Sequence, residues 1–72
     1  MYSRIRELRE DKDMNQTIMA KLLDMSQTGY SKYETGENDI PTAVLIKLAQ
    51  IHDTSVDYLL GLTKERKPYP RG

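Results

Sequence analysis

The chain has 72 residues, of which 38% are apolar and 31% charged, and its eleven Lys and Arg residues balance eleven Asp and Glu residues. A chain of this length supports one small core but not a core together with an enzyme cleft, and its composition is typical of a soluble globular domain. Because there is no cysteine and only one histidine, we expect no disulfide, no metal site and no cofactor. No apolar run approaches the roughly 20 residues that span a bilayer, so we expect a cytoplasmic protein without a membrane partner.

Residues 3–12 are predicted to form the first helix, with Ser3 as its cap. Ile5, Leu8 and Arg9 fall on one face of this helix at spacings of three and four. An arginine on a buried face needs a partner, because an unpaired buried charge is costly. The sequence therefore predicts an ionic partner for Arg9 elsewhere in the chain.

Residues 15–36 are predicted to form two short helices joined by a tight turn. Asn15 is expected to cap the first of them, residues 16–23, and Ser26 the second, residues 27–35. Their common apolar face consists of residues at helical spacing: Met19, Ala20, Leu23, Met25, Tyr30 and Tyr33. Both helices are therefore expected to pack against one core.

The turn and the outer face of the second of these helices indicate a DNA-binding motif. Asp24 stands in the turn, where a residue that tolerates left-handed backbone angles is needed, and Gly36 is expected to end the helix in that conformation. The outer face carries residues with hydrogen-bonding side chains: Gln27, Thr28, Ser31 and Lys32. Two helices joined this tightly, the second bearing such side chains, are what a DNA-binding helix-turn-helix requires.

Four residues of this motif have two interpretations each. Gln16 stands at the start of its helix, where free backbone amides and the helix dipole favour an anion, so we expect it to bind a phosphate; the alternative is a solvated glutamine. Gly29 should destabilise its helix by about 1 kcal/mol relative to alanine, either because a ligand approaches the backbone closely or because the position is unimportant. Ile18 and Leu22 are expected to face outward, as a small patch for a protein partner or, as we prefer, as scattered exposed apolar residues.

A fourth helix is predicted to begin near Pro41, with Asp39 or Thr42 as its cap. Residues 44–51 have the strongest amphipathic pattern in the chain. His52 follows them and is interpreted as a residue of the helix end, not as a catalytic base.

Ser55 is expected to cap a short fifth helix, residues 56–60, which ends at Gly61. Residues 63–72 contain four cations and two prolines without a periodic apolar pattern. This segment is expected to be disordered, as a linker or as a basic arm that touches phosphates. The helix-turn-helix domain is therefore expected to comprise residues 1–62.

Several short motifs stand in a fixed order and spacing along the chain. They are Ile-Arg-Glu-Leu-Arg at 5–9, Asn-Gln at 15–16, Met-Ala at 19–20, Met-Ser-Gln at 25–27, Ser-Lys-Tyr-Glu at 31–34, Gly36, Leu-Ile-Lys-Leu-Ala at 45–49 and Ser-Val-Asp-Tyr-Leu-Leu-Gly at 55–61. Together they resemble the Cro and phage-repressor type (XRE family) of helix-turn-helix regulators, over residues 4–62. The chain departs from that pattern in its turn and second motif helix: Asp24 replaces a glycine, Tyr30 replaces a branched aliphatic residue, and Gly29 lacks a side chain that often contacts DNA.

The resemblance implies an all-α, five-helix, lambda-repressor-like DNA-binding domain with the helix-turn-helix at helices 2 and 3, the third helix entering the major groove. It implies that three residues read bases: Gln27, Thr28 and Lys32. It implies that four residues contact the DNA backbone: Gln16, Ser31, Tyr33 and Asn38. It also implies that Arg9 and Glu34 form a buried ion pair.

The main hypothesis is a sequence-specific, repressor-like transcriptional regulator that binds a palindromic operator as a homodimer. Its subunits are expected to meet around Val56, Tyr58 and Leu62, and zero net charge predicts weak non-specific binding to DNA. The alternative is a protein-interaction module of the same fold, such as an antitoxin-like partner, favoured by the zero charge and by Ile18 and Leu22. An enzyme is not expected, because no nucleophile and base are paired in the sequence.

Overall fold

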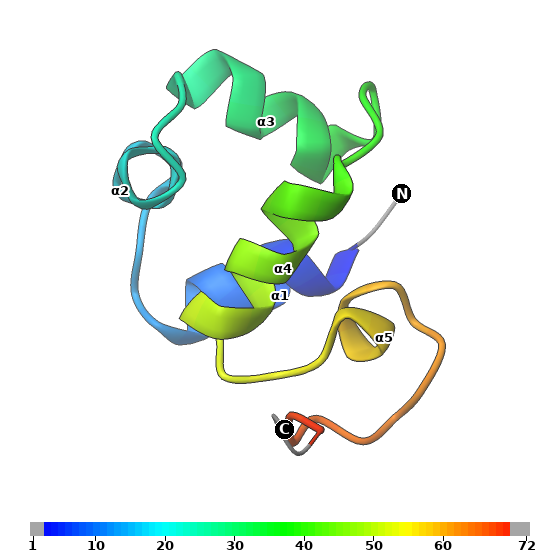
Figure 1. Ribbon diagram of the computed structural model, residues 1–72. Coiled ribbons are helices and arrows are strands. Elements are labelled where there is room, and N and C mark those ends of the chain that lie inside the picture. Colours follow the sequence, from blue (N-terminus) through cyan, green and yellow to red (C-terminus); the bar gives the residue numbers. More distant parts are fainter. Residues whose placement is uncertain (1–2, 70–72) are drawn as a thin grey trace.

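The computed structural model of the protein describes residues 3–69, which form five helices and no strand. In chain order these are α1 (Ser3–Asp11), α2 (Gln16–Leu22), α3 (Gln27–Thr35), α4 (Thr42–Ile51) and α5 (Val56–Leu59) (Figure 1). The all-α, five-helix fold is therefore confirmed, and the observed helix ends lie close to the predicted ones. None of these helices is long and apolar enough to cross a bilayer.

Three helices begin with the side-chain caps that the sequence predicts. The Asn15 side chain accepts a hydrogen bond from the Ile18 amide at 2.8 Å, and the Ser26 hydroxyl accepts one from the Gly29 amide at 3.1 Å. Ser55 in the same way accepts from the Tyr58 amide at 3.0 Å. Each cap satisfies one backbone donor that the first turn of a helix leaves without a partner.

The predicted caps of two other helices are wrong. Pro41 occupies the cap position of α4, and no side chain caps that helix. Thr42 already lies inside the helix and Asp39 lies too far before it, so neither side chain is at the position from which a cap reaches the first amides. Ser3 is the first residue of α1 itself.

Left-handed backbone angles occur where α2 and α3 end. Asp24, in the turn after α2, has φ 56°, as the sequence predicts, and Gly36 at the end of α3 has φ 83°. Aspartate adopts this conformation at a lower cost than most side chains, although at a higher cost than glycine. The turn between α2 and α3 therefore forms without the glycine that is usual there.

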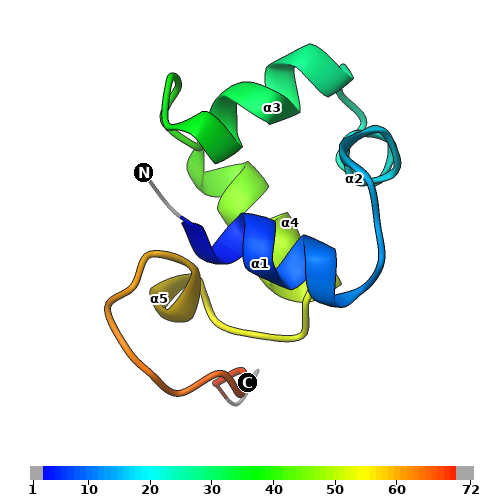
Figure 2. The same ribbon diagram turned by 180° about the vertical axis from the view of Figure 1, so that it is seen from behind.

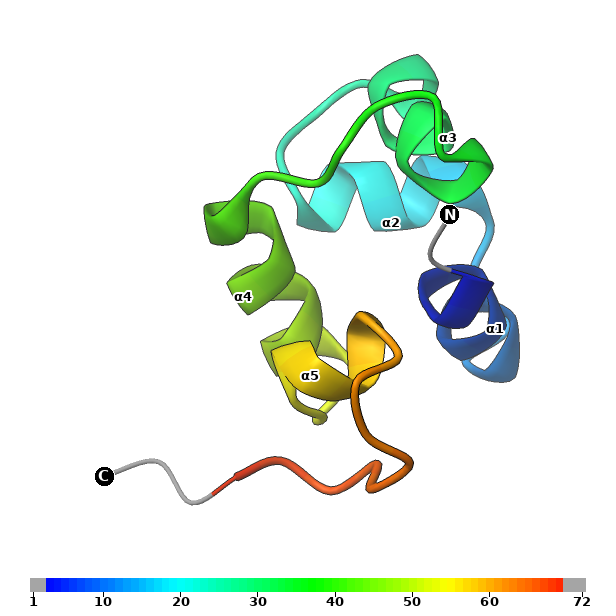
Figure 3. The ribbon, with the colours of Figure 1, turned by 90° about the vertical axis from the view of Figure 1, so that its right-hand side faces the viewer.

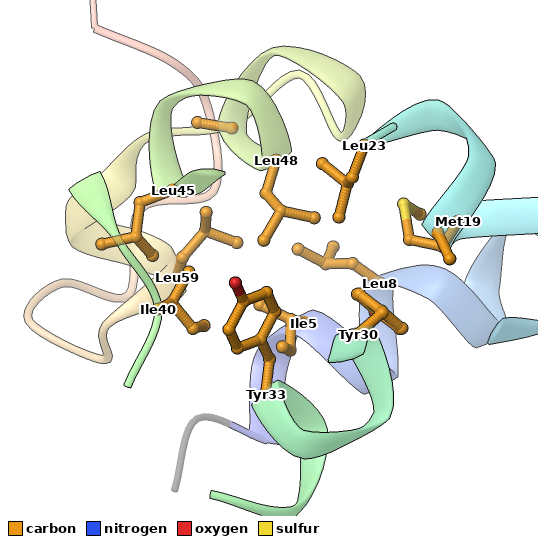
Figure 4. Close-up of a cluster of buried hydrophobic side chains, with 12 residues drawn as sticks. Ile5, Leu8, Met19, Leu23, Tyr30, Tyr33, Ile40, Leu45, Leu48 and Leu59 are labelled. Carbon is orange, nitrogen blue, oxygen red and sulfur yellow. The ribbon is translucent and has the colours of Figure 1, made fainter. Parts of the chain in front are cut away.

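The core lies where the helices converge (Figure 4). Fully or almost fully buried residues come from all five helices: Ile5 and Leu8 of α1, Met19 of α2, Tyr30 of α3, Leu48 of α4 and Leu59 of α5. α4 lies in front of α1 in Figure 1 and behind it in Figure 2, and Figure 3 shows the two helices on opposite sides of the core. The α2–α3 pair covers one end of this arrangement, and α5 lies at the other.

Residues 63–69 contact the helical body, although we expected them to belong to a disordered segment. The Arg4 guanidinium donates to the Thr63 carbonyl at 2.6 Å, and the Thr54 hydroxyl donates to the Arg66 carbonyl at 2.5 Å. Side chains of the body therefore bind the backbone of this segment, an interaction that needs no apolar periodicity in the segment itself. Residues 70–72 lie outside the described part of the chain, and the domain boundary at residue 62 stays a prediction.

Candidate nucleic-acid interface

α3 presents its polar residues on the side away from the core. Gln27, Thr28 and Lys32, the predicted base readers, are all exposed, and Ser31 is half-buried. Asn38 is exposed and lies beside the end of this helix. Its backbone amide donates to the Lys32 carbonyl at 3.1 Å, and this bond turns the loop back. These five residues therefore lie along one helix and the loop that follows it.

Tyr33 differs from the other predicted DNA contacts because it is only 9% exposed. Its ring packs edge-on against that of Tyr30, with the ring centroids 6.4 Å apart and an angle of 87° between the planes. Such an edge-to-face pair is a favourable aromatic contact. The inner face of α3 is thus held by two tyrosines, and the contact of Tyr33 with a phosphate stays a prediction.

Arg9 and Glu34 form a bidentate ion pair inside the protein. Arg9 Nε lies 2.7 Å from Glu34 Oε2 and Arg9 Nη2 lies 3.1 Å from Glu34 Oε1. The third donor group of the arginine, Nη1, donates to the Met14 carbonyl at 2.7 Å. This pair joins α1 to α3 and supplies the partner that the buried Arg9 requires.

The ion pair is charged at neutral pH. Burial by itself would raise the pKa of the Glu34 carboxyl, but hydrogen bonds, above all those from Arg9, lower it below its ordinary value. The hydrogen bond to Glu34 likewise raises the pKa of Arg9. Both partners are therefore ionised across the physiological range.

Gln16 extends this pair to the surface of α3. Its side-chain nitrogen donates to Glu34 Oε1 at 3.1 Å, and its side-chain oxygen accepts a hydrogen bond from the side-chain nitrogen of Gln27 at 2.8 Å. A continuous chain of hydrogen bonds thus runs from Arg9 through Glu34 and Gln16 to Gln27. The two glutamines are the first residues of α2 and α3, and their contact depends on how these two helices meet, for which the sequence offered no signal.

Gly29 stands where there is little room for a side chain, which neither of its two interpretations anticipated. A Cβ atom at this position would lie 3.1 Å from the Ser26 hydroxyl oxygen and 3.1 Å from the terminal methyl carbon of Met25. The Ser26 oxygen caps α3 by accepting from the Gly29 amide. A side chain at residue 29 would therefore press on the cap of its own helix.

Lys32 has a neighbour of opposite charge that the sequence reasoning missed. Its ammonium nitrogen lies 4.0 Å from Glu37 Oε2, and both side chains are exposed. Exposed pairs of this kind stabilise a protein by at most about 1 kcal/mol, so the ammonium group remains available to a ligand. The five-residue separation across the helix end gave no periodic signal for this contact.

The C-terminal segment lies at the other end of the molecule. Figures 1 and 3 both show α3 at one end and residues 63–69 at the opposite end, below α5. The cations Lys64, Arg66 and Lys67 therefore do not extend the polar surface of α3 in this structure. The basic arm that touches phosphates stays a prediction, and in this arrangement it would act away from α3.

The apolar residues named for protein contacts lie on two separate surfaces. Ile18 and Leu22, one turn apart on α2, are 45% and 44% exposed, as the outward orientation predicted. Val56 and Tyr58 of α5 are half-buried, and Leu62 just beyond it is 73% exposed.

Comparison with known proteins gives one family and several curated relatives. The model of the helix-turn-helix family matches residues 5–59. The chain is similar to the uncharacterized HTH-type transcriptional regulator YobD of Bacillus subtilis (strain 168), with 35% identity over 94% of this chain and 62% of YobD. It is also similar to the HTH-type transcriptional regulator AnsR of the same organism, with 34% identity over 94% of this chain and 59% of AnsR.

A third relative, the SPbeta prophage-derived uncharacterized HTH-type transcriptional regulator YonR of the same organism, is 37% identical over 79% of this chain and 53% of its own length. The chain thus spans roughly three fifths of the length of the first two relatives. No solved structure matches the chain.

Proposed function

The chain belongs to the helix-turn-helix family, and from this premise we propose that it is a sequence-specific, repressor-like DNA-binding regulator that reads the major groove with α3. The observation that carries the proposal is the chain of hydrogen bonds that ends at Gln27 on the exposed face of α3. The expectation that the chain is not an enzyme is confirmed by this family. Because a regulator of this kind acts on DNA, we also propose that the protein is located in the cytoplasm.

Gln27 has the hydrogen-bonding groups that adenine requires. A glutamine amide has two N–H donors and one carbonyl acceptor, and Gln16 accepts one of the donors of Gln27. The remaining N–H and the carbonyl oxygen match N7 and the amino group of adenine in the major groove. Because Gln16 holds the amide of Gln27, less side-chain freedom is lost when that base is bound.

Gln16 keeps one N–H free for a phosphate in a corresponding way. Its other N–H donates to Glu34, and its oxygen accepts from Gln27. Gln16 also stands at the start of α2, where backbone amides and the helix dipole favour an anion. One residue would then fix both the position of the protein on the DNA backbone and the orientation of the base-reading glutamine.

The remaining predicted contacts complete the interface. Lys32 would donate to the acceptors of guanine, and Thr28 would contact an adjacent base. Three residues would position α3 on the DNA backbone: Ser31, Tyr33 and Asn38.

We propose that two subunits bind a palindromic operator, with half-sites about one helical turn apart, and meet around Val56, Tyr58 and Leu62. The 73% exposure of Leu62 supports an apolar contact there.

Selection of bound sequences from a random DNA pool tests the proposal. The expected result is a palindrome with an adenine in each half-site, which the Gln27→Ala variant no longer prefers, at a loss of about 1–3 kcal/mol of discrimination. Thr17→Ala is the matched control, because Thr17 is also exposed but lies on α2. A pool without enrichment, or a preference that Gln27→Ala leaves intact, would contradict the assignment.

A protein-interaction module of the same fold, such as an antitoxin-like partner, is the second candidate. It is favoured by Ile18 and Leu22, which expose nearly half of their surface one turn apart on α2. Salt dependence separates the two functions, because neutralisation of phosphates releases counterions. DNA affinity that falls steeply with rising salt supports the regulator, whereas no affinity even at low salt supports the interaction module.

A further inference from the structure

The segment of residues 63–69, called the strap here, is bound to the body by the side chains of Thr54 and Arg4. Thr54 is 1% exposed, and its hydroxyl donates to the Arg66 carbonyl. A buried hydroxyl that loses its partner pays a desolvation cost, so this bond favours the bound strap. Arg4 adds a second bond, to the Thr63 carbonyl, while its guanidinium also stacks on the Tyr58 ring at 4.1 Å from the centroid.

The outer end of the strap contacts α5 and borders a groove beside it. The Tyr69 hydroxyl donates to Asp57 Oδ2 at 2.9 Å. Pro68 and Tyr69 line an open groove of about 390 Å³ together with Ile46 of α4 and Val56 of α5. Val56 is also one of the residues proposed to join two subunits, so the strap and a second subunit would meet at the same residue.

Large apolar side chains of α4, of the strap and of the residue before the strap stay exposed while the strap is bound. Ile46 is 48% exposed and Leu62 is 73% exposed while the strap is bound, and Tyr69 itself is 54% exposed. These three, with Ile18 and Leu22 on α2, are the large apolar side chains that the described residues leave exposed. Exposed apolar side chains that line a groove, here Ile46 and Tyr69, suit a self-complementary contact between identical subunits.

We propose that the strap competes with self-association: while it is bound it borders the groove at Val56 of α5, and a second copy of this chain occupies that groove when the strap is released. The inference rests on the homodimer of the proposed function and adds its regulation. Because an isologous dimer uses the same surface on both subunits, both straps have to leave. A change in the equilibrium constant for strap binding by a given factor therefore changes the dimer dissociation constant by the square of that factor.

Two variants of the full chain weaken the strap without altering the proposed contacts between subunits. Thr54→Val removes the buried donor at nearly constant volume, and Tyr69→Phe removes only an exposed hydroxyl, so the second folds even where the first is unstable. Loss of one hydrogen bond should shift strap binding roughly threefold to tenfold. The dimer dissociation constant should then fall roughly tenfold to a hundredfold, whereas the control Thr42→Val, at an exposed threonine of α4, leaves it unchanged.

Two measurements on each variant decide the matter: hydrogen exchange of the strap amides, and sedimentation equilibrium in the absence of DNA. Faster exchange together with tighter self-association supports the proposal. Faster exchange with an unchanged dimer constant overturns it and leaves the homodimer intact. Unchanged exchange in both variants overturns it as well, because these contacts then do not hold the strap. If neither the variants nor the unaltered chain self-associates, the homodimer itself is wrong, and a gel shift on the same samples shows whether DNA binding survives.

Discussion

Glu34→Gln is the substitution for which the structure gives the sharpest expectation. It removes one charge from a pair whose side chains are 11% (Arg9) and 3% (Glu34) exposed and leaves Arg9 charged beside a neutral amide. Removal of one partner from a buried pair costs about 3–5 kcal/mol, because the remaining charge has lost its compensation. A domain of this size has a total stability of roughly 5–10 kcal/mol, so the variant should lose about half of it.

Urea denaturation at pH 7 measures this loss directly as a change in the free energy of unfolding. Glu10→Gln is the matched control, because Arg6 and Glu10 form a pair on the same helix at 3.8 Å with both side chains more than half exposed. That control should cost less than about 0.5 kcal/mol. The double variant Arg9→Met with Glu34→Leu should recover much of the loss, because apolar residues of similar volume need no compensation.

A cost of Glu34→Gln no larger than that of Glu10→Gln would contradict this expectation. The buried pair would then contribute no more than an exposed one, and α1 and α3 would be held together by the apolar core alone. A second readout concerns function: the double variant should fold but bind its operator more weakly. In it, Gln16 has lost its bond to Glu34, so it no longer holds the amide of Gln27 as firmly.

Three further predictions follow from single side chains. Burial, aided by the charges of Lys12 and Arg66, lowers the pKa of His52 to about 4, so the folded state resists protonation of this side chain. The free energy of unfolding, measured with urea, should therefore fall by up to about 3 kcal/mol as the pH drops from 6.5 to 4. The His52→Gln variant should lack this pH-dependent loss. Ser26→Ala should cost about 1 kcal/mol by loss of the α3 cap, whereas Ser3→Ala should cost markedly less in the same assay. Arg4→Lys keeps the charge but not the geometry of the bonds to Tyr58 and Thr63, and should lower the thermal midpoint by several degrees, a result that an unchanged midpoint would refute.

The helices and most of their ends could be predicted because the signals for them are local. Asn15, Ser26 and Ser55 each reach an amide three residues later, and Gly36 ends α3 through its own backbone angle. Pro41 shows the limit of such signals, since the choice between the cap and the first helical position depends on how the preceding loop enters α4.

The candidate site was predictable only in part. The polar face of α3 follows from helical spacing, and burial of Arg9 required a partner, but its identification as Glu34 came from the resemblance to a family. The contacts between Gln16 and Gln27 and between Gly29 and its neighbours were not foreseen. They depend on the angle at which α2 meets α3, which no spacing in the sequence specifies.

The sequence by itself determined which residues form helices, which faces of those helices are apolar and which side chains cap α2, α3 and α5, because these properties depend on neighbours three or four residues away. The tertiary structure alone decided which distant polar groups meet: Arg9 with Glu34, Gln16 with Gln27, and the body with the strap through Thr54. Such contacts join residues 11 to 25 positions apart. They form only after the apolar faces have packed and have brought their donors and acceptors within 3 Å of one another, and for this reason the fold could be predicted before the site.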